Sequence, residues 1–182
     1  KVAAARKLLD AAGLYGDRVC VDHWPLNDVP YADYFANLVV SETALLTGQW
    51  PGDAERLVRM VKPLGGTILI GQPEGGGADG KRLEAGAVRG WLEQPALAGG
   101  QLVDQHGVWL KYVRGPLPGA GNWTHQYANA GNTACSDDQI VKTPLGVLWF
   151  GRPGPGDMMN RHVRAAAPLS FGGRLLVQGE NV

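Results

Sequence analysis

The chain has 182 residues, with 17 basic and 17 acidic side chains and a formal net charge of zero. Without an excess of positive charge, we expect no binding to nucleic acid or to an anionic membrane surface. No apolar run reaches the roughly 20 residues of a membrane-spanning helix, and the two cysteines are too few for a disulfide-rich scaffold.

The first part of the chain alternates helical and strand patterns. Apolar residues at helical spacing predict a helix over 2–12 that ends at Gly13. Residues 18–22 predict a short strand. The uninterrupted apolar run 37–41 predicts a second strand, buried on both faces as in a parallel sheet.

The middle of the chain continues this alternation. Asp53 is expected to cap a helix over 54–62, which a Pro and a Gly-Gly pair then end. Residues 67–70 predict another buried strand, and residues 82–93 predict a further helix. Because the first residues already have the pattern of a helix interior, we expect the chain to be a segment of a longer polypeptide.

The order of these elements predicts an α/β fold with a doubly wound, mostly parallel sheet. Residues 101–104 and 108–113 predict a hairpin joined by a tight turn, which would form an antiparallel edge of that sheet. The predicted α/β domain spans residues 1–115.

A change of composition follows residue 115. Residues 116–122 are rich in Pro and Gly and predict a linker. Residues 123–182 show no helical period, and short apolar runs at 146–150 and 174–178 predict an all-β segment.

A glycine-rich loop follows the strand 67–70. Gly75, Gly77 and Gly80 match G-x-G-x-x-G, and Gly75, Gly80 and Lys81 match the front of a P-loop. Both motifs use backbone N–H groups to hold phosphate. Arg82 stands where a P-loop has Ser or Thr, so a surface loop without a nucleotide is the alternative.

Three motifs succeed one another between residues 29 and 66: the turn Val29-Pro30-Tyr31, the strand 37–41, and the helix end VKPLGG at 61–66. In this order and spacing they resemble the second half of class I S-adenosylmethionine-dependent methyltransferases. That family has a Leu-Pro-Phe-like turn, a strand written F-D-l-V-v-s and a helix ending in L-K-P-G-G. Here Asn37 stands at the place of the family's Asp, and Leu64 is inserted. The later helix and hairpin also agree with the family's last strands.

Polar residues follow two of the predicted strands, at the sheet edge where such folds bind ligands. The resemblance implies that Asp22 and His23 lie near the adenine of S-adenosylmethionine, and Ser41 and Glu42 near its methionine moiety or the methyl acceptor. The family's glycine-rich cofactor loop and its ribose-binding acid would precede Lys1, so the N-terminal strands of the sheet are expected to be missing. If the domain is active, it is a methyltransferase of the cytoplasm. Capping and solvation of the strand ends are the alternative role of these four residues.

A second resemblance is carried by aromatic and polar residues in a set order: Trp123, His125, Tyr127, Asn132, Thr133, Ser136, Leu148 and Trp149. With the later run APLSFGGRLLV, they resemble the entry into a β-propeller of the pyrroloquinoline-quinone-dehydrogenase-like type. This resemblance implies further blades beyond Val182, a place in the periplasm or cell envelope, and pyrroloquinoline quinone as the cofactor of such proteins. The alternative function is then a quinoprotein-like or non-enzymatic propeller protein in which the α/β part is a scaffold insertion.

Potential metal ligands are scattered through the second segment. They are His125, Cys135, Asp137, Asp138 and His162. Their spacing matches no metal-binding pattern, so we expect structural roles and no metal site. The expected partner of the chain is a small-molecule ligand.

Overall fold

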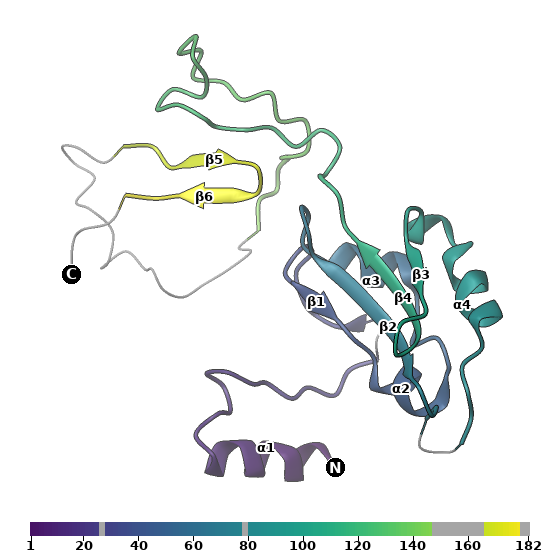
Figure 1. Cartoon of the computed structure of the whole chain (residues 1–182). Coiled ribbons are helices and arrows are strands. Elements are labelled where there is room, and N and C mark those ends of the chain that lie inside the picture. The colour runs from purple at the N-terminus through teal and green to yellow at the C-terminus, as the bar shows by residue number, and fades with distance from the viewer. Residues whose placement is uncertain (26–27, 78–79, 147–165, 179–182) are drawn as a thin grey trace.

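The computed structural model describes residues 1–25, 28–77, 80–146 and 166–178 (Figure 1). Its elements in chain order are α1 (Val2–Ala11), β1 (Leu38–Val39), α2 (Glu42–Thr47), α3 (Ala54–Met60), β2 (Thr67–Pro73), α4 (Ala85–Leu92), the 3-10 helix η2 (Pro95–Leu97), β3 (Gln101–Val103), β4 (Gly107–Val113), β5 (Leu169–Phe171) and β6 (Arg174–Leu176).

Four strands form one mixed sheet in the order β1-β2-β4-β3. β1 runs parallel to β2, whereas β4 is antiparallel to both β2 and β3. The α/β class and the parallel pair are therefore confirmed. The prediction of a mostly parallel sheet is wrong for the described strands, since two of their three pairings are antiparallel. The predicted hairpin forms and lies at one edge of the sheet, as expected, with β4 beside β2 and β3 outermost.

The core lies on one face of this sheet. Ile68 and Ile70 of β2 and Leu110 of β4 are at most 1% exposed, and period-two alternation places them on the same side. Helices α2, α3 and α4 and the 3-10 helix contribute to the same core through Ala44, Leu57, Val88 and Leu97. Helices on both faces, as in a doubly wound sheet, are not seen among the described residues.

β1 is buried on one face only. Leu38 is 57% exposed and Val40 is 60% exposed, while Val39 packs against the core. The prediction that residues 37–41 are covered on both faces is therefore wrong. Val39 lies opposite the buried Ile68, so Leu38 and Val40 point to the other face of the sheet, which is exposed at these positions.

The predicted strand at residues 18–22 does not form. The structure has only an isolated bridge between Tyr15 and Val19 in this region. Cys20 is exposed, so the alternating pattern has no core face to bury it. The Arg6 Nε donates to the carbonyl oxygen of Val21 at 2.8 Å, which satisfies this backbone group without a neighbouring strand.

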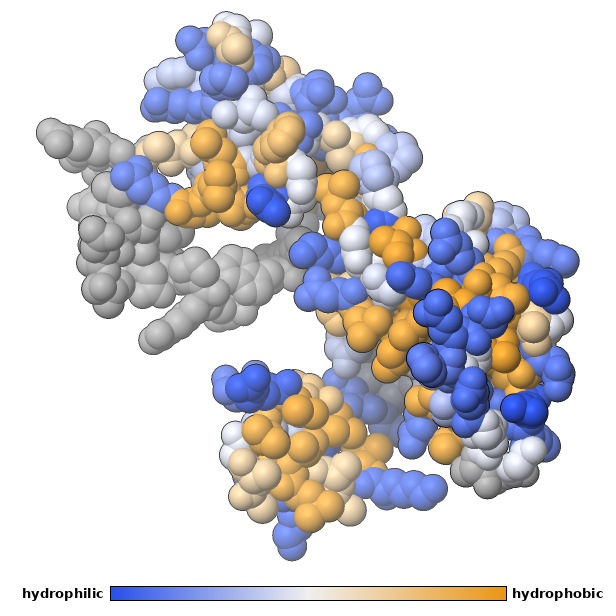
Figure 2. All heavy atoms as spheres, viewed as in Figure 1, coloured by the Kyte–Doolittle hydropathy of each residue, from blue (hydrophilic) through white to orange (hydrophobic). Residues whose placement is uncertain are grey.

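Helix α1 matches its predicted bounds to within a residue, but none of its residues is buried. It lies apart from the sheet (Figure 1), and its apolar side chains face outward on the side shown in Figure 2. Leu8, for example, is 73% exposed. No helix among the described residues has the length and hydropathy to cross a membrane.

Side-chain caps explain where the two middle helices begin. Asp53 accepts hydrogen bonds from the N–H groups of Glu55 and Arg56 and starts α3, as predicted. Ser41 accepts from the N–H of Ala44 and starts α2, which the sequence patterns did not predict. Its signals were present, because Ser41 is a favourable cap and Gly48 ends the helix in the left-handed conformation, at φ 70°.

Helix α4 begins at Ala85, three residues later than predicted. The cause is a buried side chain, since the N–H of Leu83 donates to Oε1 of Gln72 at 2.6 Å. This contact ties Leu83, two residues before the helix, to the end of β2.

In the C-terminal segment, β5 and β6 form an antiparallel hairpin with Gly172 and Gly173 at its turn. Trp123 exchanges two backbone hydrogen bonds of 2.8 Å with Ser170, so a third piece of chain borders the hairpin. The predicted strand at 146–150 and residues Leu148, Trp149 and His162 lie almost wholly outside the described residues, which include only Gly146 of that set.

Candidate functional site

The carboxyl ends of the two parallel strands lie at the same edge of the sheet. Ser41 follows β1 at this edge, and Gln72 and Pro73 end β2. Ser41 is 9% exposed, and its hydroxyl oxygen accepts from the N–H of Ala44 at 3.1 Å. Its hydroxyl proton has no acceptor among the described residues, and Glu42 is exposed in the first turn of α2. This edge thus offers one donor and one carboxylate next to each other.

Asp22 and His23 lie elsewhere, on an extended and exposed stretch. Asp22 accepts a hydrogen bond of 2.7 Å from the Tyr31 hydroxyl and forms an ion pair of 3.4 Å with Arg6. Among the described residues no hydrogen bond or ion pair connects Asp22 or His23 with Ser41 or Glu42. The contacts of Asp22 therefore hold the segment after α1 in place.

We expect the Tyr31 hydroxyl to titrate at unusually high pH. Its hydrogen bond to Asp22, followed by desolvation and the charge of that carboxylate, raises the pKa of Tyr31 above its usual value of 10.0. The folded state thus favours the neutral phenol. This contribution to stability is complete below the unfolded pKa, at about pH 10, and is lost as the pH rises through the folded pKa.

The Asp22→Asn variant tests this contact. It should lower the pKa of Tyr31, because the carboxylate no longer opposes the phenolate. The measurement is an ultraviolet phenolate titration, with Tyr31→Phe identifying the signal of this residue. Asp17→Asn, at another exposed acid, should leave the curve unchanged. A curve for Asp22→Asn that overlays the unmodified protein would contradict the assignment.

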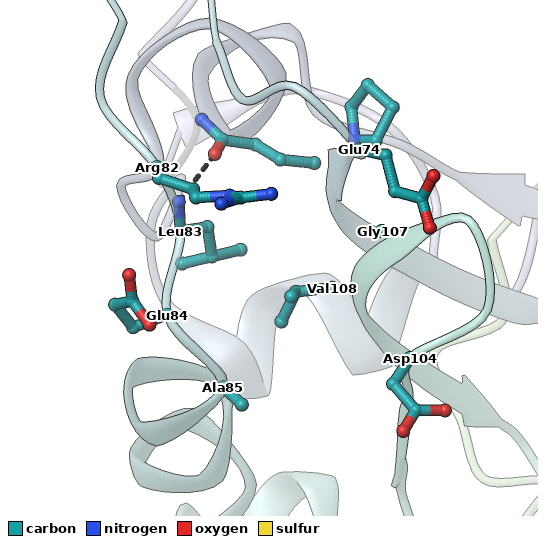
Figure 3. Close-up of a pocket in the computed structure, with 10 residues that line it drawn as sticks. Glu74, Arg82, Leu83, Glu84, Ala85, Asp104, Gly107 and Val108 are labelled. Carbon is teal, nitrogen blue, oxygen red and sulfur yellow. Dashed lines mark hydrogen bonds between the residues drawn. The ribbon is translucent and has the colours of Figure 1, made fainter.

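A cavity of about 320 Å³ opens at the same edge, beyond the end of β2 (Figure 3). Three pieces of chain enclose it: the end of β2, the segment that leads into α4, and the turn between β3 and β4. Its lining residues are Gln72, Pro73, Glu74, Arg82, Leu83, Glu84, Ala85, Asp104, Gly107 and Val108. None of the four residues predicted to bind the cofactor belongs to this set.

Gln72 is the buried polar residue of this region, at 2% exposure. Its Oε1 accepts from Leu83, whereas its Nε2 has no hydrogen-bond partner among the described residues. The sequence patterns missed Gln72, although it continues the buried alternation Ile68, Ile70, Gln72. A glutamine at a position that should be buried indicates a side chain that is hydrogen-bonded inside the protein.

The glycine-rich loop packs closely against α2. A Cβ at Gly77 would lie 2.1 Å from the carbonyl oxygen of Leu46, so only glycine fits there. The N–H of Gly77 donates to the carbonyl of Lys81 at 3.1 Å. That N–H is therefore engaged inside the loop and is not available to a phosphate, which favours the surface-loop interpretation.

The acids of the C-terminal segment hold backbone groups. The Asp138 carboxylate accepts from the N–H groups of Val141, Gly121 and Ile140 at 2.7 to 2.9 Å, and these hydrogen bonds lower its pKa. Asp137 accepts from Asn122. No group of three or more His, Cys, Asp or Glu side chains suited to a metal occurs in the part of the chain that the structure describes.

No protein-family model and no curated protein matches the chain. A crystal structure of a candidate S-adenosyl-L-methionine-dependent methyltransferase from Methanococcus maripaludis is similar in part, with 17% sequence identity and a TM-score of 0.47. The match covers 63% of this chain and 63% of that protein. A likeness of this size does not assign the fold, which rests here on the strand pairing itself.

Proposed function

We propose that residues 1–115 form the second half of a class I S-adenosylmethionine-dependent methyltransferase-like domain. The observation that carries this proposal is the parallel β1–β2 pair, with Leu38 opposite Thr67. It opens the carboxyl ends of both strands to one edge, which is where α/β sheets bind ligands. The helix α4 and the antiparallel β3–β4 hairpin that follow the pair agree with the last elements of such a domain.

Ser41 and Glu42 fit the amino-acid end of such a cofactor. The Ser41 hydroxyl has a proton to donate to a carboxylate, and the exposed Glu42 carboxylate accepts from an ammonium group. Asp22 fits the adenine end less well, because Tyr31 and Arg6 already occupy its oxygens. His23 has no hydrogen bond among the described residues and is the freer partner for the base.

When bound, S-adenosylmethionine supplies an electrophilic methyl group. The protein's task is then to hold the acceptor in line with it, since alignment supplies much of the acceleration in such a transfer. Glu42 would orient the cofactor through its ammonium group, and Ser41 would fix the carboxylate beside it. These residues bind and orient without taking part in a proton transfer.

Calorimetric titration of the full-length protein with S-adenosylhomocysteine tests the proposal. Binding heat should appear, and Glu42→Gln should weaken the affinity by about tenfold, as expected for the loss of a charge-assisted hydrogen bond. Glu55→Gln is the matched control, because Glu55 is equally exposed in the first turn of α3. The absence of heat at high protein concentration would refute the methyltransferase-like function.

A second function is favoured by the C-terminal hairpin. Trp123 extends the antiparallel β5–β6 pair by two backbone hydrogen bonds, as a third strand of a propeller blade would. We propose on this ground that residues 123–182 begin a propeller of the quinoprotein-like type, with a place in the cell envelope. A quinone absorption band that calcium removal weakens would support bound pyrroloquinoline quinone. A colourless protein would refute the bound quinone.

A further inference from the structure

The cavity at the start of α4 carries charges of both signs from three separate elements. Glu74 follows β2, Arg82 precedes α4, and Asp104 follows β3. Figure 3 shows the Arg82 guanidinium extending from its loop toward the side of the cavity where Glu74 lies, with Asp104 beside the β3–β4 turn. Glu74, Arg82 and Asp104 therefore line the same cavity.

These charges are not engaged with one another. The ion pairs of the described residues are Arg6–Asp22 and Arg59–Asp33, and no side-chain hydrogen bond involves Glu74, Arg82 or Asp104. A guanidinium and two carboxylates that line one cavity without pairing among the described residues leave room for a ligand that carries both signs.

The rest of the lining supplies an apolar surface. Leu83, Ala85 and Val108 offer aliphatic contact, as Figure 3 shows. Gln72 also lines the cavity, but its amide nitrogen Nε2 lies against Gly48 and Gly77, which are outside the lining.

We propose that this cavity binds a small molecule that carries an α-amino-acid group, with an ammonium, a carboxylate and an aliphatic side chain. Glu74 and Asp104 accept from the ammonium, Arg82 donates to the carboxylate, and the aliphatic part lies on Leu83 and Val108. Glu84 adds a third carboxylate to the lining. Because carboxylates outnumber the one guanidinium, the ammonium group of the ligand should matter more for binding than its carboxylate. The site does not depend on the proposed methyl transfer.

Backbone amide NMR spectra of the full-length protein, titrated with three matched probes, test the ligand class. The probes are L-norleucine, n-pentylamine, which lacks its carboxylate, and hexanoate, which lacks its ammonium. L-norleucine should shift the amide signals of Ala85 and Gly107 and bind more tightly than either other probe. Affinity in the millimolar range is expected because the charged side chains are exposed. Equal or stronger binding of hexanoate, or no shift at these two residues, would overturn the proposal.

Neutral variants test the residues. Arg82→Gln and Asp104→Asn should each weaken L-norleucine binding by about threefold or more, the size expected of an exposed charge pair. Arg89→Gln and Asp17→Asn are the controls, because both residues are exposed and lie outside the cavity. Unchanged binding in both test variants, or equal losses in the controls, would refute the assigned contacts.

The same variants distinguish a free amino acid from the methionine end of the cofactor. If Arg82→Gln weakens S-adenosylhomocysteine and L-norleucine alike, the cofactor is the source of the amino-acid group, and the assignment of its amino-acid end to Ser41 and Glu42 is wrong. If it weakens only L-norleucine, the ligand is a separate amino acid. Binding of L-norleucine without binding of S-adenosylhomocysteine would refute the proposed function and leave this site intact.

Discussion

Replacing Leu110 by alanine is expected to lower the free energy of unfolding by about 2–5 kcal/mol, the usual cost of a large-to-small change in a packed core. Leu110 is 0% exposed and lies opposite Ile70 on one side and Leu102 on the other. It therefore joins three strands at the centre of the sheet. Urea denaturation followed by tryptophan fluorescence measures the change.

Val113→Ala is the control for this experiment. Val113 lies on the same strand and is 50% exposed, so its truncation should change the stability by no more than about 0.5–1 kcal/mol. If both variants lose the same stability, the core does not lie on the assigned face of β4.

Replacing Gly71 by alanine should be strongly destabilising for a different reason. A Cβ at this position would lie 2.1 Å from the carbonyl oxygen of Val108 and 2.7 Å from the Cα of Trp109. These are backbone atoms of the neighbouring strand, so the β2–β4 pair must move apart. We expect a loss of about 1–3 kcal/mol or more, as for other overpacked sites, measurable as a fall in the urea midpoint.

The same substitution at Gly90 should have the opposite sign. Gly90 lies inside α4 with no atom near its absent Cβ, and alanine is favoured over glycine in helix interiors by about 0.5–1 kcal/mol. Gly90→Ala should therefore stabilise the protein slightly. A Gly71→Ala variant as stable as Gly90→Ala would show that β2 and β4 are not in close contact.

The elements that the sequence predicted well are those with a strong local signal. α3 has Asp53 at its start, and β2 has the apolar run 67–70. The hairpin of β3 and β4 has strand patterns on both sides of a tight turn. In each of them the residues that decide the structure lie within a few positions of one another, so a local pattern contains the needed information.

The wrong predictions share a dependence on distant contacts. The run 18–22 alternates as a strand should, yet it has no neighbouring strand to pair with in the described chain. The burial of β1 depends on whether a distant segment covers the face that carries Leu38 and Val40. Local alternation does not specify either arrangement.

In the candidate site, too, the part with a local sequence signal was predicted and the part that depends on distant contacts was not. Ser41 was singled out for its position after an apolar run, and it does lie at the carboxyl edge, where it also caps a helix. The cavity near α4 was not predicted, because Glu74, Arg82 and Asp104 come from segments that only the folded sheet brings together. No spacing in the sequence connects them.

The arrangement of β1 beside β2 is the claim on which the ligand edge depends, and nuclear Overhauser contacts test it directly. We predict the parallel pattern, with contacts from the α-protons of one strand to amide protons of the other between Leu38 or Val39 and Thr67 or Ile68. Close contacts between α-protons of the two strands, as antiparallel pairing gives, would contradict the account, and so would the absence of contacts between these residues.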